Sequence, residues 1–172
     1  NFTVVSADSN VEPAFSDYVL DPTSKKIENP IVYIYNTHQT ENYSYKAYED
    51  YNITPNVMMA SYILRERLDD KNIAAIVEDA NIKEILNSNS WSYSSSYKAS
   101  RFLIKDTIKK YPNIKLFIDL HRDSVSHKVS TTSSNGKKYA KVMFVIGKEY
   151  DSYKKNLEVA NKLNNIIKNK AS

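Results

Sequence analysis

Three short apolar runs divide this chain, and each has the length of a strand rather than of a helix. They cover residues 31–35 (IVYIY), 73–77 (IAAIV) and 114–120 (IKLFIDL). Runs this short, apolar and rich in β-branched and aromatic residues are typical of strands buried on both faces. Segments with helical spacing separate them. The sequence therefore predicts an α/β protein whose central sheet is mostly parallel.

The helical spacing of apolar residues predicts four helices, over residues 54–69, 82–86, 95–110 and 152–169. The first is expected to start with Thr54 as its N-cap and Pro55 as its first helical residue. A hairpin is expected between residues 126–132 and 139–146, because Asn-Gly at 135–136 is a strong turn signal. Together these elements predict a three-layer sandwich, with helices on both faces of the sheet and an added hairpin.

Residues 1–30 are polar and without a lasting period, so they are interpreted as an arm or linker, and residues 31–172 as one domain. The chain starts at Asn1 without a methionine or a signal peptide, and we expect it to be a fragment of a longer protein. No stretch approaches the ~20 apolar residues of a membrane span.

Two glycines and no cysteine in 172 residues exclude several classes of protein. Without cysteine there is no disulfide framework, zinc finger or thiolate metal site. Two isolated glycines cannot form the glycine-rich loops of P-loop or Rossmann proteins, nor a G-x-S-x-G hydrolase elbow. A net charge of +4 is too small for a chain that binds nucleic acid as a polycation.

Two histidines follow two of the predicted strands directly, His38 after the first and His121 after the third. In a parallel sheet the carboxyl ends of the strands meet at one edge, where ligands bind. With Glu41 three residues after His38, the set is a common one for catalytic zinc. The alternative is that the histidines only make hydrogen bonds and Glu41 is solvated. Weaker ligand candidates are Glu49, Asp50 and His127.

The neighbours of His121 have alternative roles. Asp119 lies on the same strand face as His121, so it either orients that imidazole or pairs with Arg122 inside the protein. Arg122 is alternatively a clamp for a substrate oxygen. Further candidates for the surroundings of the site or for substrate binding are Asp123, Tyr97 and Arg101. Trp91 and Tyr97 are interpreted as packing or rim residues rather than catalytic ones.

Three separated motifs closely resemble those of the stage II sporulation protein P family. They are residues 36–43 (NTHQTENY), 119–124 (DLHRDS) and 140–147 (AKVMFVIG). The intervening Tyr97-x-x-Ser100-Arg101 and Thr131-Thr132-x-x-Asn135-Gly136 fit the same pattern. The resemblance runs from about residue 30 to the end of the chain, with the motifs in the right order.

The family consists of cell-wall hydrolases of endospore formers, related in fold to zinc-dependent N-acetylmuramoyl-L-alanine amidases. The resemblance implies cleavage of the amide between N-acetylmuramic acid and the first L-alanine of the stem peptide, and also action on peptide cross-links. By position, His38, Glu41 and His121 match the metal site, and the implied ion is Zn²⁺. Related amidases take their glutamate ligand from just before the first long helix, where this chain has Thr54-Pro55-Asn56.

The resemblance also implies a place in the cell. It implies a protein outside the cytoplasmic membrane, at the septum between mother cell and forespore, anchored through a segment that this chain lacks. The implied partners are peptidoglycan and the lytic transglycosylase stage II sporulation protein D, during engulfment.

The family and its relatives continue past the last helix to a strand that carries a glutamate general base. This chain ends at Ser172, and Glu149 and Glu158 lie in the wrong context to replace that residue. We therefore expect a C-terminally incomplete domain that binds zinc but turns over muropeptides poorly. The alternatives are an inert peptidoglycan-binding or scaffold module, and a metallohydrolase with another substrate.

Overall fold

A computed structural model describes residues 27–43 and 55–171 of the chain. The chain divides into two compact units, residues 1–122 and 123–172, and each is described by itself. Most of the predicted N-terminal arm lies outside the described residues, and so do the ligand candidates Glu49 and Asp50. The predicted boundary at residue 30 stays a prediction.

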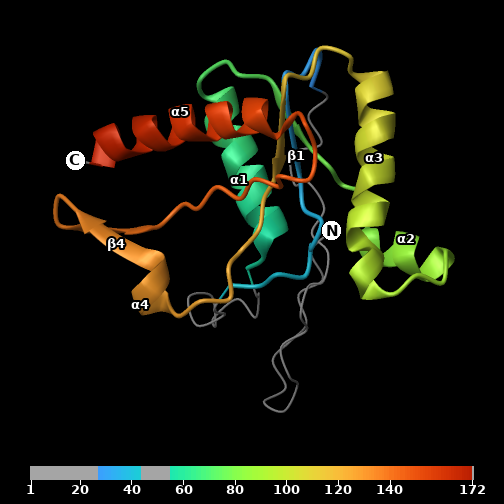
Figure 1. Ribbon diagram of the computed structural model, residues 1–172, viewed down its shortest axis with the longest axis horizontal. Helices are drawn as coiled ribbons and strands as arrows, with labels where there is room; N and C mark the ends of the chain where they lie inside the picture. The colour runs from blue at the N-terminus through green and yellow to red at the C-terminus, as the bar shows by residue number, and fades with distance from the viewer. Residues whose placement is uncertain (1–26, 44–54, 172) are drawn as a thin grey trace, which may run out of the picture. The chain divides into compact units, whose positions relative to one another are not determined.

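The first unit is built on a three-stranded parallel sheet in the order β2-β1-β3 (Figure 1). Its strands are β1 (Val32–Tyr35), β2 (Ala75–Val77) and β3 (Leu116–Asp119). The central strand β1 is the most buried, with Ile34 fully enclosed. The predicted parallel α/β arrangement is confirmed by this small sheet, although each strand is shorter than the apolar run that predicted it.

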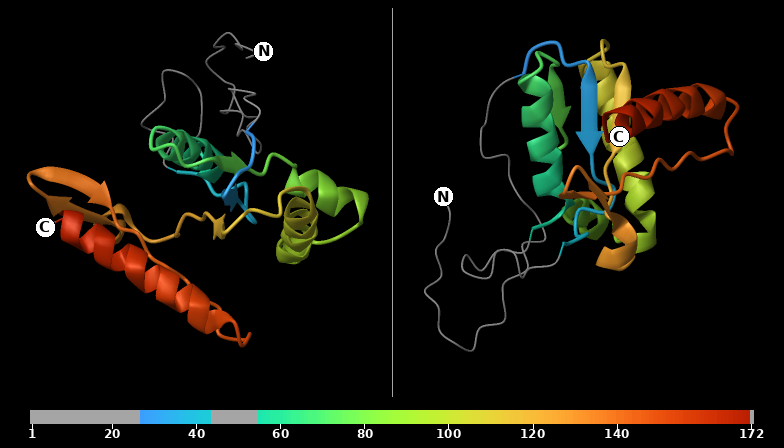
Figure 2. Two further views of the ribbon diagram at one scale, coloured as in Figure 1. Left: turned by 90° about the horizontal axis from the view of Figure 1, so that it is seen from above. Right: turned by 90° about the vertical axis from the view of Figure 1, so that its left-hand side faces the viewer.

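Helices of the first unit flank the sheet. They are α1 (Val57–Asp69), α2 (Ile82–Ser88), the 3-10 turn η2 (Tyr93–Ser95) and α3 (Ser96–Lys110). Helix α1 packs against β1 and β2, whereas α2 packs against α3. Figure 2 shows α1 and α3 on opposite sides of the sheet. All three predicted helices of this unit are present within a few residues of their expected bounds.

The start of α1 differs from the prediction. Asn56, not Thr54, is the N-cap, and its side-chain oxygen accepts the Met59 N–H at 3.2 Å. Pro55 lies before the helix, where its carbonyl accepts the Tyr43 N–H at 2.7 Å. Asparagine is at least as good an N-cap as threonine, and the bond to Tyr43 holds the chain extended at Pro55. Thr54 lies outside the described residues.

Two apolar clusters stabilise the first unit. One joins Val32, Ile34 and Ala75 under the partly buried leucines of α1. The other joins α2 to α3 and includes Trp91, whose ring stacks on Phe102 at 6.0 Å between centroids. The interpretation of Trp91 as a packing residue is therefore confirmed.

The second unit contains α4 (His127–Ser130), a two-stranded hairpin and α5 (Tyr153–Ala171). The hairpin pairs β4 (Thr131–Ser134) with β5 (Lys137–Ala140) in antiparallel register. Asn135 and Gly136 form its turn with φ of 50° and 73°, the left-handed conformation that a two-residue hairpin turn requires. The predicted turn and the predicted last helix are confirmed.

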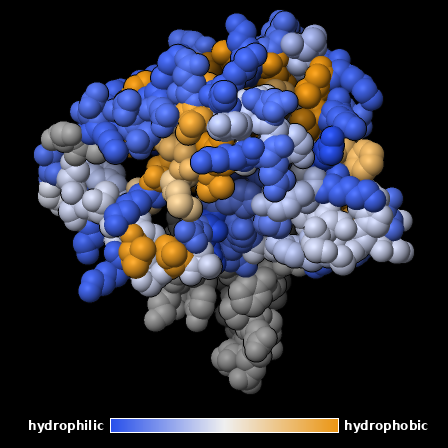
Figure 3. Space-filling view, in the orientation of Figure 1, coloured by the Kyte–Doolittle hydropathy of each residue, from blue (hydrophilic) through white to orange (hydrophobic). Residues whose placement is uncertain are grey.

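The predicted strands of this hairpin are partly wrong. Residues 127–130 form the short helix α4, and residues 141–146 form no strand. The Lys141 N–H still bonds the Ser130 carbonyl, but residues 127–130, which the prediction paired with the second strand, are helical. Val142, Met143 and Val145 are consequently exposed. Figure 3 shows apolar patches on an otherwise hydrophilic surface.

Candidate metal centre

The loop after β1 is tied to β3 by buried polar side chains. The Asn36 side chain donates from Nδ2 to the Leu120 carbonyl at 2.6 Å. Thr37 donates twice to Asp119, from its backbone N–H to Oδ1 at 2.9 Å and from its hydroxyl to Oδ2 at 2.7 Å. Because β1 and β3 are parallel neighbours, with Tyr35 opposite Asp119, both strands deliver their following residues to the same edge.

Gln39 ties the same loop to the segment between β2 and α2. Its amide donates to the Ala80 carbonyl and accepts the Ile82 N–H, each at 2.8 Å. Gln39 is buried, so both groups of its amide are satisfied inside the protein. The buried residues 36, 37 and 39 therefore fix the path of the loop, and His38 between them projects toward the site.

His38, Glu41 and His121 converge at this edge, with one possible ligand atom of each within 4.8 Å of the others. Oε1 of Glu41 lies 3.6 Å from Nδ1 of His38 and 3.2 Å from Nδ1 of His121. The two imidazole centroids are 5.2 Å apart. The structure thus brings together the three residues that the sequence nominated, although Glu41 and His121 are 80 residues apart in the chain.

Glu41 is held by its second oxygen. Oε2 accepts the Arg122 backbone N–H at 2.6 Å, which leaves Oε1 directed at the two histidines. The Arg122 side chain donates from Nε to the Asn42 carbonyl at 2.7 Å. Glu41 is therefore not a freely solvated carboxylate, and Arg122 stabilises the loop that carries it.

Asp119 lies on the opposite edge of the His121 ring. Its Oδ2 is 3.1 Å from Nε2 of His121, so the imidazole lies between two carboxylates. The hydrogen bond to Asp119 raises the pKa of His121 to about 9, with a smaller contribution from Glu41 and against the effect of burial. The structure places Asp119 beside His121, and its orienting role stays a prediction.

The donor set fits a divalent transition metal. Two imidazoles and one carboxylate are a ligand set of catalytic zinc sites, which keep a fourth position for water or substrate. The three side chains are about a quarter exposed, so the site is open to solvent. No cysteine competes for the metal. These residues can hold a zinc ion without rearrangement of the sheet.

Two tyrosines flank the triad. The Tyr93 ring stacks on His38 at 5.1 Å between centroids, and Tyr97 meets the same imidazole edge-on at 5.2 Å. Both tyrosines are more than half exposed, at 56% and 61%. Partial desolvation and the negative charge of Asp119 and Glu41 raise the pKa of Tyr97. Tyr97 therefore lies beside the triad, and its role there stays a prediction.

The other candidates lie elsewhere. Arg101 is exposed on α3, and no contact within the described residues joins it to the triad. Asp123 is exposed and opens the second unit, and its role at the site stays a prediction. His127 is exposed on α4 and is not part of the triad.

Sequence reasoning missed three residues of the site. Tyr93 falls in a serine-rich loop that gave no periodic signal, and only the turn η2 brings it to His38. Thr37 and Ser100 lie in the quoted motifs but received no role. The missed signal is that Thr37 and Gln39, on either side of His38, are polar residues directly after a buried strand, where polar side chains require partners.

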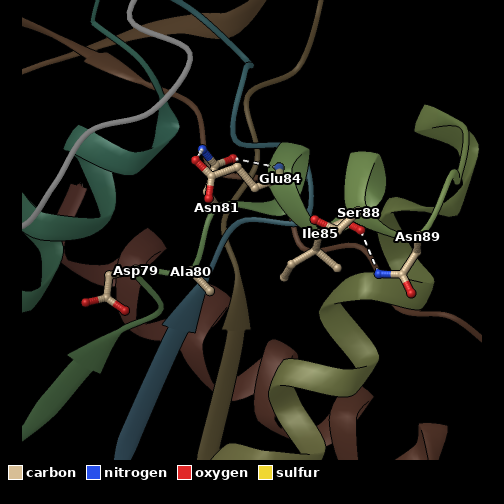
Figure 4. Close-up of a pocket in the computed structure, with 7 residues that line it drawn as sticks. All are labelled: Asp79, Ala80, Asn81, Glu84, Ile85, Ser88 and Asn89. Atoms are coloured by element: carbon tan, nitrogen blue, oxygen red, sulfur yellow. Dashed lines mark hydrogen bonds between the residues drawn. The ribbon is translucent and has the colours of Figure 1, made fainter.

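A hollow lies along α2 and is lined by residues of that helix and of the segment before it (Figure 4). Its polar groups are largely bonded to one another: Asn81 caps the Glu84 N–H, and Asn89 donates to the Ile85 carbonyl at 2.8 Å. It contains no histidine and none of the predicted site residues. The triad is therefore the candidate centre.

Comparison with known proteins yields a family match. Residues 5–171 match the family model described as stage II sporulation protein P. The chain belongs to the stage II sporulation protein P family. The stage II sporulation protein P of Bacillus subtilis (strain 168) is 32% identical over 149 residues, which cover 83% of this chain and 37% of that protein. No solved structure matches the chain.

Membership of the stage II sporulation protein P family makes this a sporulation protein and confirms the resemblance seen in the motifs. The chain spans little more than a third of the curated relative that it matches. Among the described residues, no helix is long and apolar enough to cross a membrane.

Proposed function

We propose that this chain carries the metal site of a zinc-dependent peptidoglycan hydrolase that acts in endospore engulfment. The proposed reaction is hydrolysis of the amide between N-acetylmuramic acid and L-alanine, with peptide cross-links as a second class of substrate. The observation that carries the proposal is the convergence of His38, Glu41 and His121 at the carboxyl edge of a parallel sheet. Membership of a sporulation family favours a cell-wall substrate.

His38, Glu41 and His121 would hold the zinc ion. When bound, zinc supplies a Lewis acid that polarises a carbonyl and lowers the pKa of a bound water to ~7. The protein supplies the positioning: Arg122 directs Glu41, and Asp119 directs His121. Tyr97 keeps its proton near neutral pH, so its hydroxyl can donate a hydrogen bond to a substrate oxygen.

The exposed rings of Tyr93 and Tyr97 offer a surface for substrate beside the triad. Aromatic faces pack against the apolar faces of sugar rings, and this supports a glycan-linked substrate. The wider proposal follows the family. It comprises an amidase-like three-layer domain, a location outside the membrane at the septum, anchoring through another segment, and stage II sporulation protein D as partner.

The metal is tested first, because the assay does not require turnover. Purified chain, dialysed against a trace of zinc, should retain one zinc per molecule, and His38→Ala and His121→Ala should each lose it. His127→Ala is the matched control, since that imidazole is exposed outside the triad, and it should retain the metal. A wild-type chain that holds no zinc would contradict the proposal.

The reaction is tested on purified cell wall with stoichiometric amounts of protein. Mass spectrometry should find stem peptides with a free N-terminal L-alanine, and His121→Ala should release none. If the products are cut only within the peptides, the proposed activity is that of an endopeptidase and not of an amidase.

An inert peptidoglycan-binding module is the second candidate, and the exposed tyrosines Tyr93 and Tyr97 are the observation that favours it. It predicts that the protein sediments with cell wall, holds no stoichiometric zinc and releases nothing. Retained zinc together with released peptide would exclude this candidate.

A further inference from the structure

A buried hydroxyl pair connects helix α3 to the metal centre. The side chains of Thr37 and Ser100 are 1% and 3% exposed, and their hydroxyl oxygens lie 2.8 Å apart. Thr37 follows β1, and Ser100 is on α3. Buried hydroxyls without partners destabilise a protein, so each of these two hydroxyl protons needs an acceptor inside the fold.

The direction of the hydrogen bonds follows from the number of protons. An ionised carboxylate only accepts, so the single hydroxyl proton of Thr37 goes to Oδ2 of Asp119 at 2.7 Å. Thr37 can then only accept from Ser100, whose other acceptor, the Ser96 carbonyl, is more distant at 3.2 Å. The hydrogen bonds therefore run in series from Ser100 to Thr37 to Asp119, and each bond polarises the next.

This series of hydrogen bonds fixes Asp119 as an acceptor. Oδ1 takes the Thr37 N–H at 2.9 Å, and Oδ2 faces both the Thr37 hydroxyl and Nε2 of His121. A carboxylate faces each ring nitrogen of His121, but Thr37 fixes Asp119 as a hydrogen-bond acceptor at Nε2, so Nδ1 is the nitrogen that remains for a ligand. Nδ1 is the atom that faces Oε1 of Glu41.

We propose that Ser100 and Thr37 are positioning residues of the metal centre, and that through Asp119 they make His121 bind the cation by Nδ1. The inference rests on the proposed zinc site and adds to it the ligand atom and the residues that select it. Neither hydroxyl touches the triad, so both act through Asp119.

The test is zinc affinity measured by competition with a chromophoric chelator on the full chain. Thr37→Val keeps the shape and the backbone bond of Thr37 but removes the hydroxyl. It should weaken zinc binding by about 10-fold, the lower end of the loss for a direct partner of a ligand, because Thr37 acts one residue further out, through Asp119. Thr37→Ser restores the hydroxyl and should restore most of the affinity. Ser100→Ala removes only the outer link and should have a smaller effect in the same direction.

Thr107→Val is the matched control. Thr107 is also a buried threonine, its hydroxyl bonds the Tyr33 side chain, and it lies further along α3. Its loss should lower the midpoint of thermal unfolding as Thr37→Val does but leave zinc affinity unchanged. Should Thr37→Val fail to fold, Ser100→Ala and Thr107→Val form the comparison.

The ligand atom is read by NMR of ¹⁵N-histidine in the zinc-loaded protein. His121 should show a protonated Nε2 and a metal-bound Nδ1. The inference is overturned if His121 binds through Nε2, or if Thr37→Val and Ser100→Ala bind zinc as tightly as Thr107→Val. In either case wild-type zinc binding would still stand, and with it the proposed function; a wild-type chain without zinc would overturn both.

Discussion

At the scale of single residues, the site depends on side chains in which each of two polar atoms has its own partner. Glu41 faces the two histidines with Oε1 and is fixed through Oε2 by the Arg122 N–H. His121 faces Glu41 with Nδ1 and Asp119 with Nε2. Such double use leaves little freedom of rotation, and a preorganised set of ligands loses less entropy on binding a cation.

Glu41→Gln separates the charge of Glu41 from its shape. The amide oxygen can still accept the Arg122 N–H, so the loop should remain folded, but the anionic ligand is gone. Zinc affinity should fall by more than the 10- to 100-fold typical of losing an outer partner. Glu158→Gln, an exposed carboxylate paired with Lys162 on α5, is the control and should bind zinc normally. Equal affinity in the two variants would remove Glu41 from the ligand set.

Tyr33 makes the stability of the fold sensitive to alkaline pH. Burial, and next the hydrogen bond to Glu78 at 2.5 Å, raise the pKa of Tyr33 well above its usual value near 10. Above pH 10 the unfolded chain ionises at this residue and the folded chain does not. The contribution of Tyr33 is therefore complete below pH 10 and is lost as pH rises, at about 1.4 kcal/mol per pH unit.

Tyr33→Phe lacks this titration. It should be the less stable protein at pH 8, because the bond to Glu78 is gone. The difference should narrow by about 1 kcal/mol between pH 10 and 11, because the unfolded tyrosine is already half ionised at pH 10. Urea unfolding at three pH values measures this. A difference that stays constant through pH 11 would show that Tyr33 ionises equally in both states.

At the scale of elements, the loop between β1 and α1 does most to build the site. Its buried residues contact three other segments: Asn36 bonds the Leu120 carbonyl, Thr37 bonds Asp119, and Gln39 bonds the segment before α2. The β1 end is thereby fixed to both neighbouring strands. These bonds fix the backbone on both sides of His38.

Gln39→Ala tests this dependence. It leaves the Ala80 carbonyl and the Ile82 N–H without their partner in a buried region, which should destabilise the fold by about 1–3 kcal/mol per unsatisfied group. Asn89→Ala removes an exposed side-chain bond to Ile85 on α2 and should cost well under 1 kcal/mol. Urea unfolding compares the two. Equal losses would mean that Gln39 does not fix the loop.

Much at this scale could be predicted from the sequence, and the limits have physical causes. Apolar runs and helical spacing predicted the three parallel strands and the helices, and parallel pairing predicted that His38 and His121 share an edge. The predicted N-cap of α1 was wrong because the bond between Tyr43 and Pro55 is a tertiary contact that local sequence does not reveal. The strand at residues 141–146 was wrong because apolar composition does not supply a pairing partner. The stack of Tyr93 on His38 could not be predicted, since it depends on how the turn η2 folds back.

At the scale of the whole molecule, both apolar clusters and all three candidate ligands lie in the first unit. The second unit holds the hairpin and α5, whose apolar residues Leu157, Leu163 and Ile167 are exposed. Family membership covers both units, since the match runs from residue 5 to residue 171. The metal site therefore belongs to the part of the chain that has its own core.

Zinc should stabilise the folded chain as a whole. An ion that binds only the native state at 100 times its dissociation constant adds about 2.7 kcal/mol, which corresponds to roughly 5–10 °C in the unfolding midpoint of a chain of this size. A chelator should reverse the shift. The variant His121→Ala should show no shift of the midpoint. A wild-type midpoint that is the same with and without zinc would mean that the native state does not bind the metal.

The central claim is that His38, Glu41 and His121 share one zinc ion. An anomalous-scattering map at the zinc edge, from crystals of the zinc-loaded protein, tests it most directly. We expect a single peak about 2.0–2.2 Å from Nδ1 of His121, a nitrogen of His38 and a carboxylate oxygen of Glu41. A zinc-loaded crystal with no peak between these three side chains, or with the ion held elsewhere, would contradict the claim.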